Sequence, residues 1–138
     1  PRDGTYRLWF RDLNHRGDAR AVYRLTVGAL PHATALFPIG GRRGTSVAVR
    51  FVGPHVGDDP QEVAVPADAP SILSVGKALP ATNPRPFHVG EWPEVFAAGP
   101  IHSAETAQRI AVPATVNGRF TEERSDHFRF TLAAPATL

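Results

Sequence analysis

The chain contains no cysteine, which excludes disulfide bonds, thiolate zinc sites and cysteine nucleophiles. It contains a single lysine, Lys77, so its basic side chains are almost all arginines, and they give a net charge of only +2. Acidic residues are interleaved with these arginines, whereas a nucleic-acid-binding protein concentrates positive charge on one face. We therefore expect no nucleic-acid partner.

Long apolar runs are also missing. None reaches the roughly 20 residues that span a bilayer, so we expect no membrane span. The chain shows no signal peptide and does not begin with Met. We expect it to be an internal piece of a longer protein.

Residues that interrupt helices are abundant. Fourteen prolines and twelve glycines leave almost no room for long helices. Apolar residues instead alternate with polar ones in short runs, the period of half-buried strands, separated by turns about every ten residues. This pattern favours a β-sandwich. The predicted strands are 33–37, 47–51, 62–65, 72–75, 85–89, 114–120 and 127–132, with one helical turn at 103–108.

The first 28 residues predict a β-hairpin. Apolar and polar residues alternate over 5–11 and again over 23–27, on either side of a turn-forming Asn-His-Arg-Gly-Asp stretch. A lone two-stranded hairpin is only marginally stable in water. We therefore expect this segment to pair with residues 114–132, either within the chain or between chains.

The Gly-Gly-Arg-Arg-Gly stretch at 40–44 allows three readings: a phosphate cradle, a nucleic-acid finger or a turn. A phosphate-binding loop needs Gly-x-x-x-x-Gly-Lys-Ser/Thr before a helix, because the lysine and the helix N-terminus hold the phosphates. This stretch has no lysine and precedes the strand predicted at 47–51. We predict a surface turn whose two arginines add a local positive patch.

The central part of the chain has a Pro, spaced glycines and alternating valines that end in glycine. This order resembles that of an IPT/TIG domain, and the resemblance implies an immunoglobulin-like β-sandwich over residues 29–90. The residues that carry it are Pro38, Gly41, Gly44, Val47, Val49, Gly53 and Gly57.

The flanks resemble parts of a bacterial pre-peptidase C-terminal domain, a secreted jelly-roll-like sandwich. Residues 1–28 are similar to its last two strands. Residues 91–138 are similar to a linker followed by its first strands, with Thr-Ala-Gln, Asn-Gly and Asp-x-Phe-x-Phe features. The resemblance implies an all-β chain, an immunoglobulin-like sandwich flanked by β-hairpin and strand segments, in the order found in modular surface proteins of bacteria such as planctomycetes.

The family's opening Glu-Pro-Asn-Asp helps some relatives to bind calcium. This chain has Gly-Pro-Ile-His at 99–102 instead, and these side chains supply none of the oxygens that calcium requires. We therefore predict no calcium site and no cofactor.

No other grouping of residues predicts metal binding or catalysis. The six histidines lack the i, i+4 spacing of metal ligands, and we interpret His55 with Asp58 and Asp59 as a polar loop. No serine lies in a Gly-x-Ser-x-Gly elbow. Arg-Gly-Asp at 16–18 spells the integrin-recognition tripeptide, but Gly and Asp are ordinary turn residues. We predict neither a metal site nor an enzyme.

The possible interaction surface contains two tryptophans. Trp9 shares one face of its predicted strand with Arg7 and Arg11. Exposed aromatic residues stack on sugars or anchor protein partners, and interfaces favour Trp and Arg. The alternative is that a neighbouring module covers Trp9. We expect the second tryptophan, Trp92, to fill a joint between modules.

These observations predict a non-catalytic segment that spaces, displays or assembles parts of a large modular bacterial surface protein. Its location would be extracellular or on the cell surface, and its partners other modules or other copies joined by strand pairing. The alternative is a carbohydrate- or protein-binding accessory module of a secreted hydrolase, with a polysaccharide or a surface protein as partner.

Overall fold

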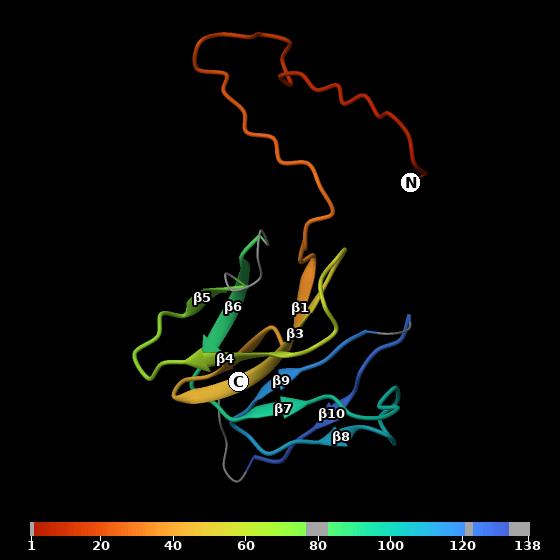
Figure 1. The fold of residues 1–138 in the computed structure, drawn as a ribbon. Helices are drawn as coiled ribbons and strands as arrows, with labels where there is room; N and C mark the ends of the chain where they lie inside the picture. Colours follow the sequence, from red (N-terminus) through yellow and green to blue (C-terminus); the bar gives the residue numbers. More distant parts are fainter. Residues whose placement is uncertain (1, 77–82, 121–122, 133–138) are drawn as a thin grey trace.

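The computed structural model describes residues 2–76, 83–120 and 123–132. These residues form strands, turns and irregular segments without a helix, so the predicted all-β class is confirmed (Figure 1). Within the same ranges, no helix is long and apolar enough to cross a membrane. The strands are β1 (Ala35–Phe37), β2 (Gly40–Arg42), β3 (Thr45–Val52), β4 (Gln61–Val65), β5 (Ile72–Val75), β6 (Arg85–Gly90), β7 (Glu94–Phe96), β8 (Gln108–Arg109), β9 (Thr115–Asn117) and β10 (Phe128–Arg129).

The first sheet is antiparallel and has the strand order β1-β3-β4. Its register places Leu36 opposite Phe51. Because successive side chains of a strand point to opposite faces, Val49 and Phe51 of β3 are buried while Arg50 between them is exposed. The prediction of a strand at 47–51 with its arginine toward solvent is confirmed.

The second sheet has the strand order β2-β6-β5. Strand β2 runs parallel to β6, and β5 runs antiparallel to it. The short segment 35–42 therefore contributes to both sheets, first as β1 and then as β2. It links the edges of the two sheets along one side of the molecule.

The two sheets share one hydrophobic core. Val49 of the first sheet and Phe87 of the second are fully buried. Full burial of such a side chain contributes about 1.5–3 kcal/mol, so these contacts are a main source of stability. The core consists of Ala33, Leu36, Val49, Phe51, Val65, Ala69, Val75 and Phe87.

The Gly-Gly-Arg-Arg-Gly stretch is not the surface turn that the sequence predicts. Gly41 is buried in β2, and only Arg43 and Gly44 form the turn. A Cβ atom on Gly41 would lie 2.6 Å from Val47 Cγ2 and 3.1 Å from Phe87 Cζ, so only glycine lets β2 approach the core this closely. Gly41 is therefore needed for close packing, whereas Gly44 is part of the turn.

The predicted positive patch at this turn is also reduced. The guanidinium group of Arg43 donates hydrogen bonds to the carboxylate of Glu91 and to the backbone carbonyl of Ala69. Arg42 is exposed. Arg43 therefore has a structural role, whereas Arg42 remains exposed at the surface.

The described residues from 91 to 132 form two short parallel pairs, β7 with β9 and β8 with β10. They contact the sandwich through Phe37, whose ring meets that of Phe96 edge-on at 6.0 Å between centroids. Arg119 Cζ lies 4.0 Å from the centroid of the same Phe37 ring. The predicted strands at 114–120 and 127–132 contain β9 and β10, whereas β7 and β8 were not predicted.

Residues 2–28, which we call the arm, extend away from the sandwich (Figure 1). The arm contains no strand, so the predicted hairpin is wrong for this chain. Among the described residues it does not pair with 114–132 either. The chain enters the sandwich just after the arm, where His32 N donates to Pro54 O at 2.9 Å and Thr34 N to Val52 O at 2.8 Å.

Candidate interaction surface

Two local turns shape the middle of the arm. The carboxylate of Asp12 accepts hydrogen bonds from the backbone N–H groups of Asn14 and Arg16, at 3.0 and 3.2 Å. The carboxylate of Asp18 accepts one from Arg20 N at 2.7 Å. Aspartate side chains form such turns readily because they can replace backbone partners. The Arg-Gly-Asp tripeptide at 16–18 thus joins two aspartate-stabilised turns, with Arg16 in the first and Asp18 in the second.

Arg20 also pairs with the second turn. Its guanidinium donates to Asp18 Oδ2 at 3.1 Å, and both side chains are exposed. The side-chain hydrogen bond from Arg20, with the backbone N–H groups of Arg20 and Ala21, holds the pKa of Asp18 below its ordinary value. The aspartate of the tripeptide is therefore already engaged within the arm.

One aromatic contact joins the two halves of the arm. The rings of Phe10 and Tyr23 meet edge-on with their centroids 4.5 Å apart. They border a hollow of about 430 Å³ that also involves Asp12, Gly17 and Val22. In the sequence, Phe10 precedes Arg16 by about as many residues as Tyr23 follows Gly17. A hairpin with its turn at Arg16-Gly17 would place these two positions opposite each other, and their rings meet here although no hydrogen-bonded ladder forms.

The structure brings two of the four predicted surface residues into contact and exposes a third beside them on the arm. Arg7, Trp9 and Arg11 are all exposed on the arm, and Arg11 Cζ lies 5.0 Å from the centroid of the Trp9 ring. At this distance a guanidinium group is attracted by the ring face. Trp9 is 79% exposed, so no part of the described chain covers it.

Trp92 lies apart from this group, in the connection between β6 and β7. It is 53% exposed, so it does not fill a joint within the described part of the chain. The joint between the sandwich and the C-terminal part is made instead by Phe37, Phe96 and Arg119. Sequence reasoning missed these residues because none belongs to a recognisable motif.

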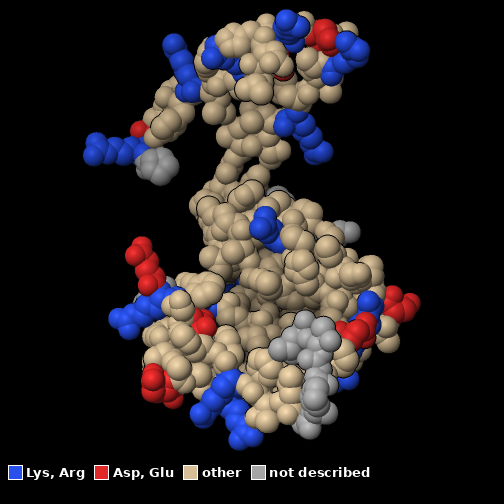
Figure 2. All heavy atoms as spheres, turned by 180° about the vertical axis from the view of Figure 1, so that it is seen from behind, with Lys and Arg blue, Asp and Glu red and all other residues tan. Residues whose placement is uncertain are grey.

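Charge distinguishes the arm from the rest of the chain. Residues 2–28 carry six arginines and three aspartates, whereas the remaining residues carry nine basic and ten acidic side chains. Figure 2 shows basic side chains spread over the arm and mixed charges over the sandwich. The weak overall charge therefore conceals a basic arm joined to a nearly neutral body.

A second hollow lies where the C-terminal part meets the sandwich. It has a volume of about 540 Å³ and is bordered by Phe37, Ile101, His102, Arg119 and Asp126, among others. His102 Nδ1 lies 3.6 Å from Asp126 Oδ1 and is buried without a hydrogen-bond partner in the described chain. The two groups form an ion pair only when the histidine is protonated.

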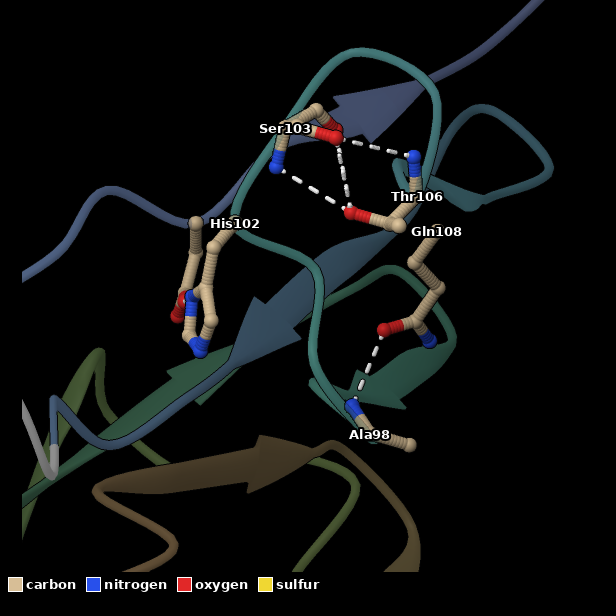
Figure 3. A network of polar contacts seen from close by, with 6 residues as sticks. Ala98, His102, Ser103, Thr106 and Gln108 are labelled. Carbon is tan, nitrogen blue, oxygen red and sulfur yellow. Dashed lines mark hydrogen bonds and ion pairs between the residues drawn. The ribbon is translucent and has the colours of Figure 1, made fainter.

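A serine stands next to this histidine but is not aligned with it. Ser103 Oγ lies 3.2 Å from Thr106 Oγ1, and the side chain points away from the His102 ring (Figure 3). A catalytic serine requires a base within hydrogen-bond reach. The reciprocal Ser103–Thr106 contacts form a single turn in place of the predicted helical turn, before β8 begins at Gln108.

Gln108 ties this turn to the neighbouring strand. Its side-chain oxygen accepts a hydrogen bond from Ala98 N at 3.0 Å (Figure 3), and its side-chain nitrogen donates to Phe96 O at 2.9 Å. A primary amide satisfies a backbone donor and a backbone acceptor at once in this way. The glutamine of the Thr-Ala-Gln feature thus has a structural role.

In the part of the chain that the structure describes, no three His, Asp or Glu side chains gather closely enough to hold a metal ion. His55 has a φ of 57°, and both Asp58 and Asp59 beside it are exposed. This loop is consistent with the polar-loop interpretation.

Comparison of the chain with protein-family models, with curated proteins and with solved structures found no match.

Proposed function

We propose that this chain is a non-catalytic structural segment that assembles or spaces parts of a large modular bacterial surface protein. Its location is extracellular or on the cell surface. It joins other modules of the same protein, or other copies of itself, by strand pairing. The observation that carries this proposal is the arm, a segment with the alternation of a strand and no partner strand.

The arm exposes many large apolar side chains. Leu8 is 64% exposed, Val22 86% and Tyr23 74%. Soluble proteins rarely leave contiguous apolar surface uncovered unless a partner binds there. An extended segment with unpaired backbone groups is also a template for adding a strand to a sheet. Both properties favour pairing with another sheet over binding a small molecule.

The sandwich supplies the rigid part of the proposed spacer. Two sheets packed over one core support the immunoglobulin-like, IPT/TIG-like reading of residues 29–90. On the same proposal, residues 1–28 correspond to the last strands of a pre-peptidase C-terminal-like sandwich and become strands only when another module or copy pairs with them. Residues 91–138 correspond to a linker and the first strands of a second such sandwich. Each flank then completes its sheet with a neighbour.

We propose a non-catalytic role because Ser103, His102 and Asp126, the residues that most resemble a catalytic triad, lack the necessary geometry. Ser103 bonds with Thr106 rather than with His102, and the contact between His102 and Asp126 exceeds hydrogen-bond distance. A cofactor is not part of the proposal either.

Light scattering of residues 1–138 over a range of concentrations tests this proposal. We expect the mass to rise with concentration, because arms pair with sheet edges of other copies. The double variant Leu8→Asp, Phe10→Asp should remain monomeric, since charges cannot enter a shared core. Leu13→Asp, in the arm's turn and 91% exposed, is the matched control and should assemble normally. A wild-type chain that stays monomeric at every concentration would overturn the proposal.

One observation favours a second candidate, the carbohydrate- or protein-binding accessory module of a secreted hydrolase. The Trp9 ring is exposed with the Arg11 guanidinium beside it, and aromatic rings of this kind stack on sugars. A glycan array and a collagen pull-down test it. Binding should be lost in Trp9→Ala and kept in the control Trp92→Ala. Empty results from both assays exclude this candidate.

A further inference from the structure

We propose that the arm docks along the outer edge of β4 in a second copy of this chain and extends the sheet β1-β3-β4 by one strand. This inference rests on the proposed assembly function and names the surface that receives the arm. Four properties of β4 support it: its open edge, its charge, its pattern of buried side chains and its position relative to the arm.

Strand β4 is at the edge of its sheet. In the described chain it pairs with β3 on one side, and no strand pairs with its other side. With five residues it is longer than β1 at the opposite edge, which has three. An open edge of this kind accepts an added strand through backbone hydrogen bonds.

The chain on either side of β4 is acidic, although Arg50 of β3 donates a hydrogen bond to Asp58 O at 2.7 Å in the loop before β4. Residues 51–76 carry four carboxylates and neither arginine nor lysine. Asp58 and Asp59 come just before β4, Glu62 lies within it and Asp68 follows it. The arm has the opposite character, with six arginines against three aspartates. Complementary charges of this kind speed association and select the correct partner.

The alternation of apolar and polar side chains in β4 also matches that in residues 5–11 of the arm. In β4, Val63 and Val65 face the core while Glu62 and Ala64 are exposed. An arm strand at 5–11 would place its apolar residues beside the two valines and its arginines beside Glu62, because neighbouring strands share faces. The ion pair between an arm arginine and Glu62 would form on the solvent-facing side of the sheet. There Glu62 already accepts a hydrogen bond from Ser46 Oγ at 2.7 Å.

The edge of the second sheet at β5 is also open in the described chain, but it offers the arm's arginines no charged partner. Strand β5 ends the second sheet, and its exposed residues are Ile72 and Ser74, which carry no charge. The arm's arginines would have no partner there. Charge therefore favours β4 over β5.

The geometry favours a second copy over the arm's own β4. The arm enters the sheet at β1, which is the edge opposite β4. It projects away from the sandwich (Figure 1), and the hydrogen bonds of residues 2–28 found in the described chain have both partners within the arm. An arm that leaves from one edge and fits the other edge links copies head to tail.

Disulfide cross-linking tests this arrangement directly, since the chain contains no cysteine of its own. Full-length chains with one cysteine at position 5, 7, 9 or 11 are mixed with the Ala64→Cys chain and oxidised mildly. We expect mixed dimers at one or more of these positions, about tenfold above those from positions 6, 8 and 10, because alternate residues of a strand face opposite ways. Ala48→Cys, exposed on the neighbouring strand β3, is the matched control and should give no dimer.

A charge exchange provides a second measurement that does not depend on oxidation. Arg7→Glu with Arg11→Glu should weaken assembly about tenfold, and so should Asp59→Lys with Glu62→Lys. An equimolar mixture of the two double variants should recover assembly. Glu105→Lys with Glu123→Lys reverses two exposed carboxylates elsewhere and should have no effect.

The outcomes separate this inference from the proposed function. Assembly by light scattering without cross-links to position 64, or with equal cross-links to positions 64 and 48, overturns docking on β4 and leaves assembly intact. A monomeric wild-type chain overturns both. Recovery in the charge-exchanged mixture together with alternating cross-links establishes the arm and β4 as partners.

Discussion

The arm and strand β3 have the same sequence pattern and different structures. Residues 5–11 and 47–51 both alternate apolar with polar side chains, yet only the second set forms a strand. Strand β3 lies between β1 and β4 and is paired on both sides, whereas no strand of the described residues pairs with the arm. Alternation therefore determines which face of a strand is apolar, and neighbouring strands determine whether the strand forms.

Local hydrogen bonds contribute to this difference. At the centre of the arm, Asp12 and Asp18 bind the backbone N–H groups of nearby residues, including Asn14 and Arg20. Backbone donors satisfied in this way are removed from any hairpin ladder. The turn that follows Arg43, with Gly44 at a φ of 70°, instead leads directly into paired strands.

The largest expected difference between the two regions is in proteolysis. At a concentration low enough to keep the chain monomeric, limiting trypsin should cleave it after Arg11 at least about 1000-fold faster than after Arg50. Exposed unpaired backbone opens at almost no cost, whereas β3 opens only with the sandwich. Mass spectrometry of a time course measures both rates. Equal rates would mean that the two regions are equally ordered.

The next effect concerns burial. Phe87→Ala should lower the free energy of unfolding by about 3–5 kcal/mol, since the ring is fully buried and its loss leaves a cavity. Phe10→Ala in the arm should change it by less than about 0.5 kcal/mol. Urea denaturation of both variants measures the contrast. A similar loss in both would show that the arm belongs to the core.

A smaller effect is expected from glycine substitution. Gly41→Ala should destabilise the sandwich by about 1–3 kcal/mol, because the added methyl group meets Val47 and Phe87. Gly17→Ala in the arm has open space around it and serves as the control, with no measurable loss. The same denaturation experiment compares them. An unchanged Gly41→Ala would contradict the close approach of β2 to the core.

The smallest effect is electrostatic. In Arg20→Ala the pKa of Asp18 should rise toward its ordinary value, because the main cause of its lowering is removed. The carboxylate stabilises its turn fully above the ordinary pKa, and this contribution disappears as the pH falls through the lowered pKa. NMR titration measures the shift, with Arg24→Ala as the control. An unchanged pKa would show that the backbone donors alone maintain it.

Alternation was sufficient to predict the strands that pack on the core. Strands β3, β4, β5 and β6 lie close to their predicted ranges because their buried side chains impose a period of two. Strand β2 was not predicted because its glycines are typical of a turn. Their role in packing depends on Val47 and Phe87, which lie farther along the sequence. In the candidate surface, the pattern placed Trp9 on one face with Arg7 and Arg11 but left open whether a neighbouring module covers it. Its exposure and its contact with Arg11 depend on the arm's conformation.

The parallel pairing of β2 with β6 has a mechanical consequence. The chain enters the sandwich from the arm's side, through β1 and β2, and leaves it at the end of β6. Tension applied between the arm and the C-terminal part is borne first by β1 and its bonds to β3, and beyond β1 it pulls the start of β2 against the end of its parallel neighbour β6. This direction of force slides β2 along β6 and loads their hydrogen bonds together, whereas an antiparallel pair joined by a turn would open one bond at a time. Such a module resists stretching between its arm and its C-terminal part.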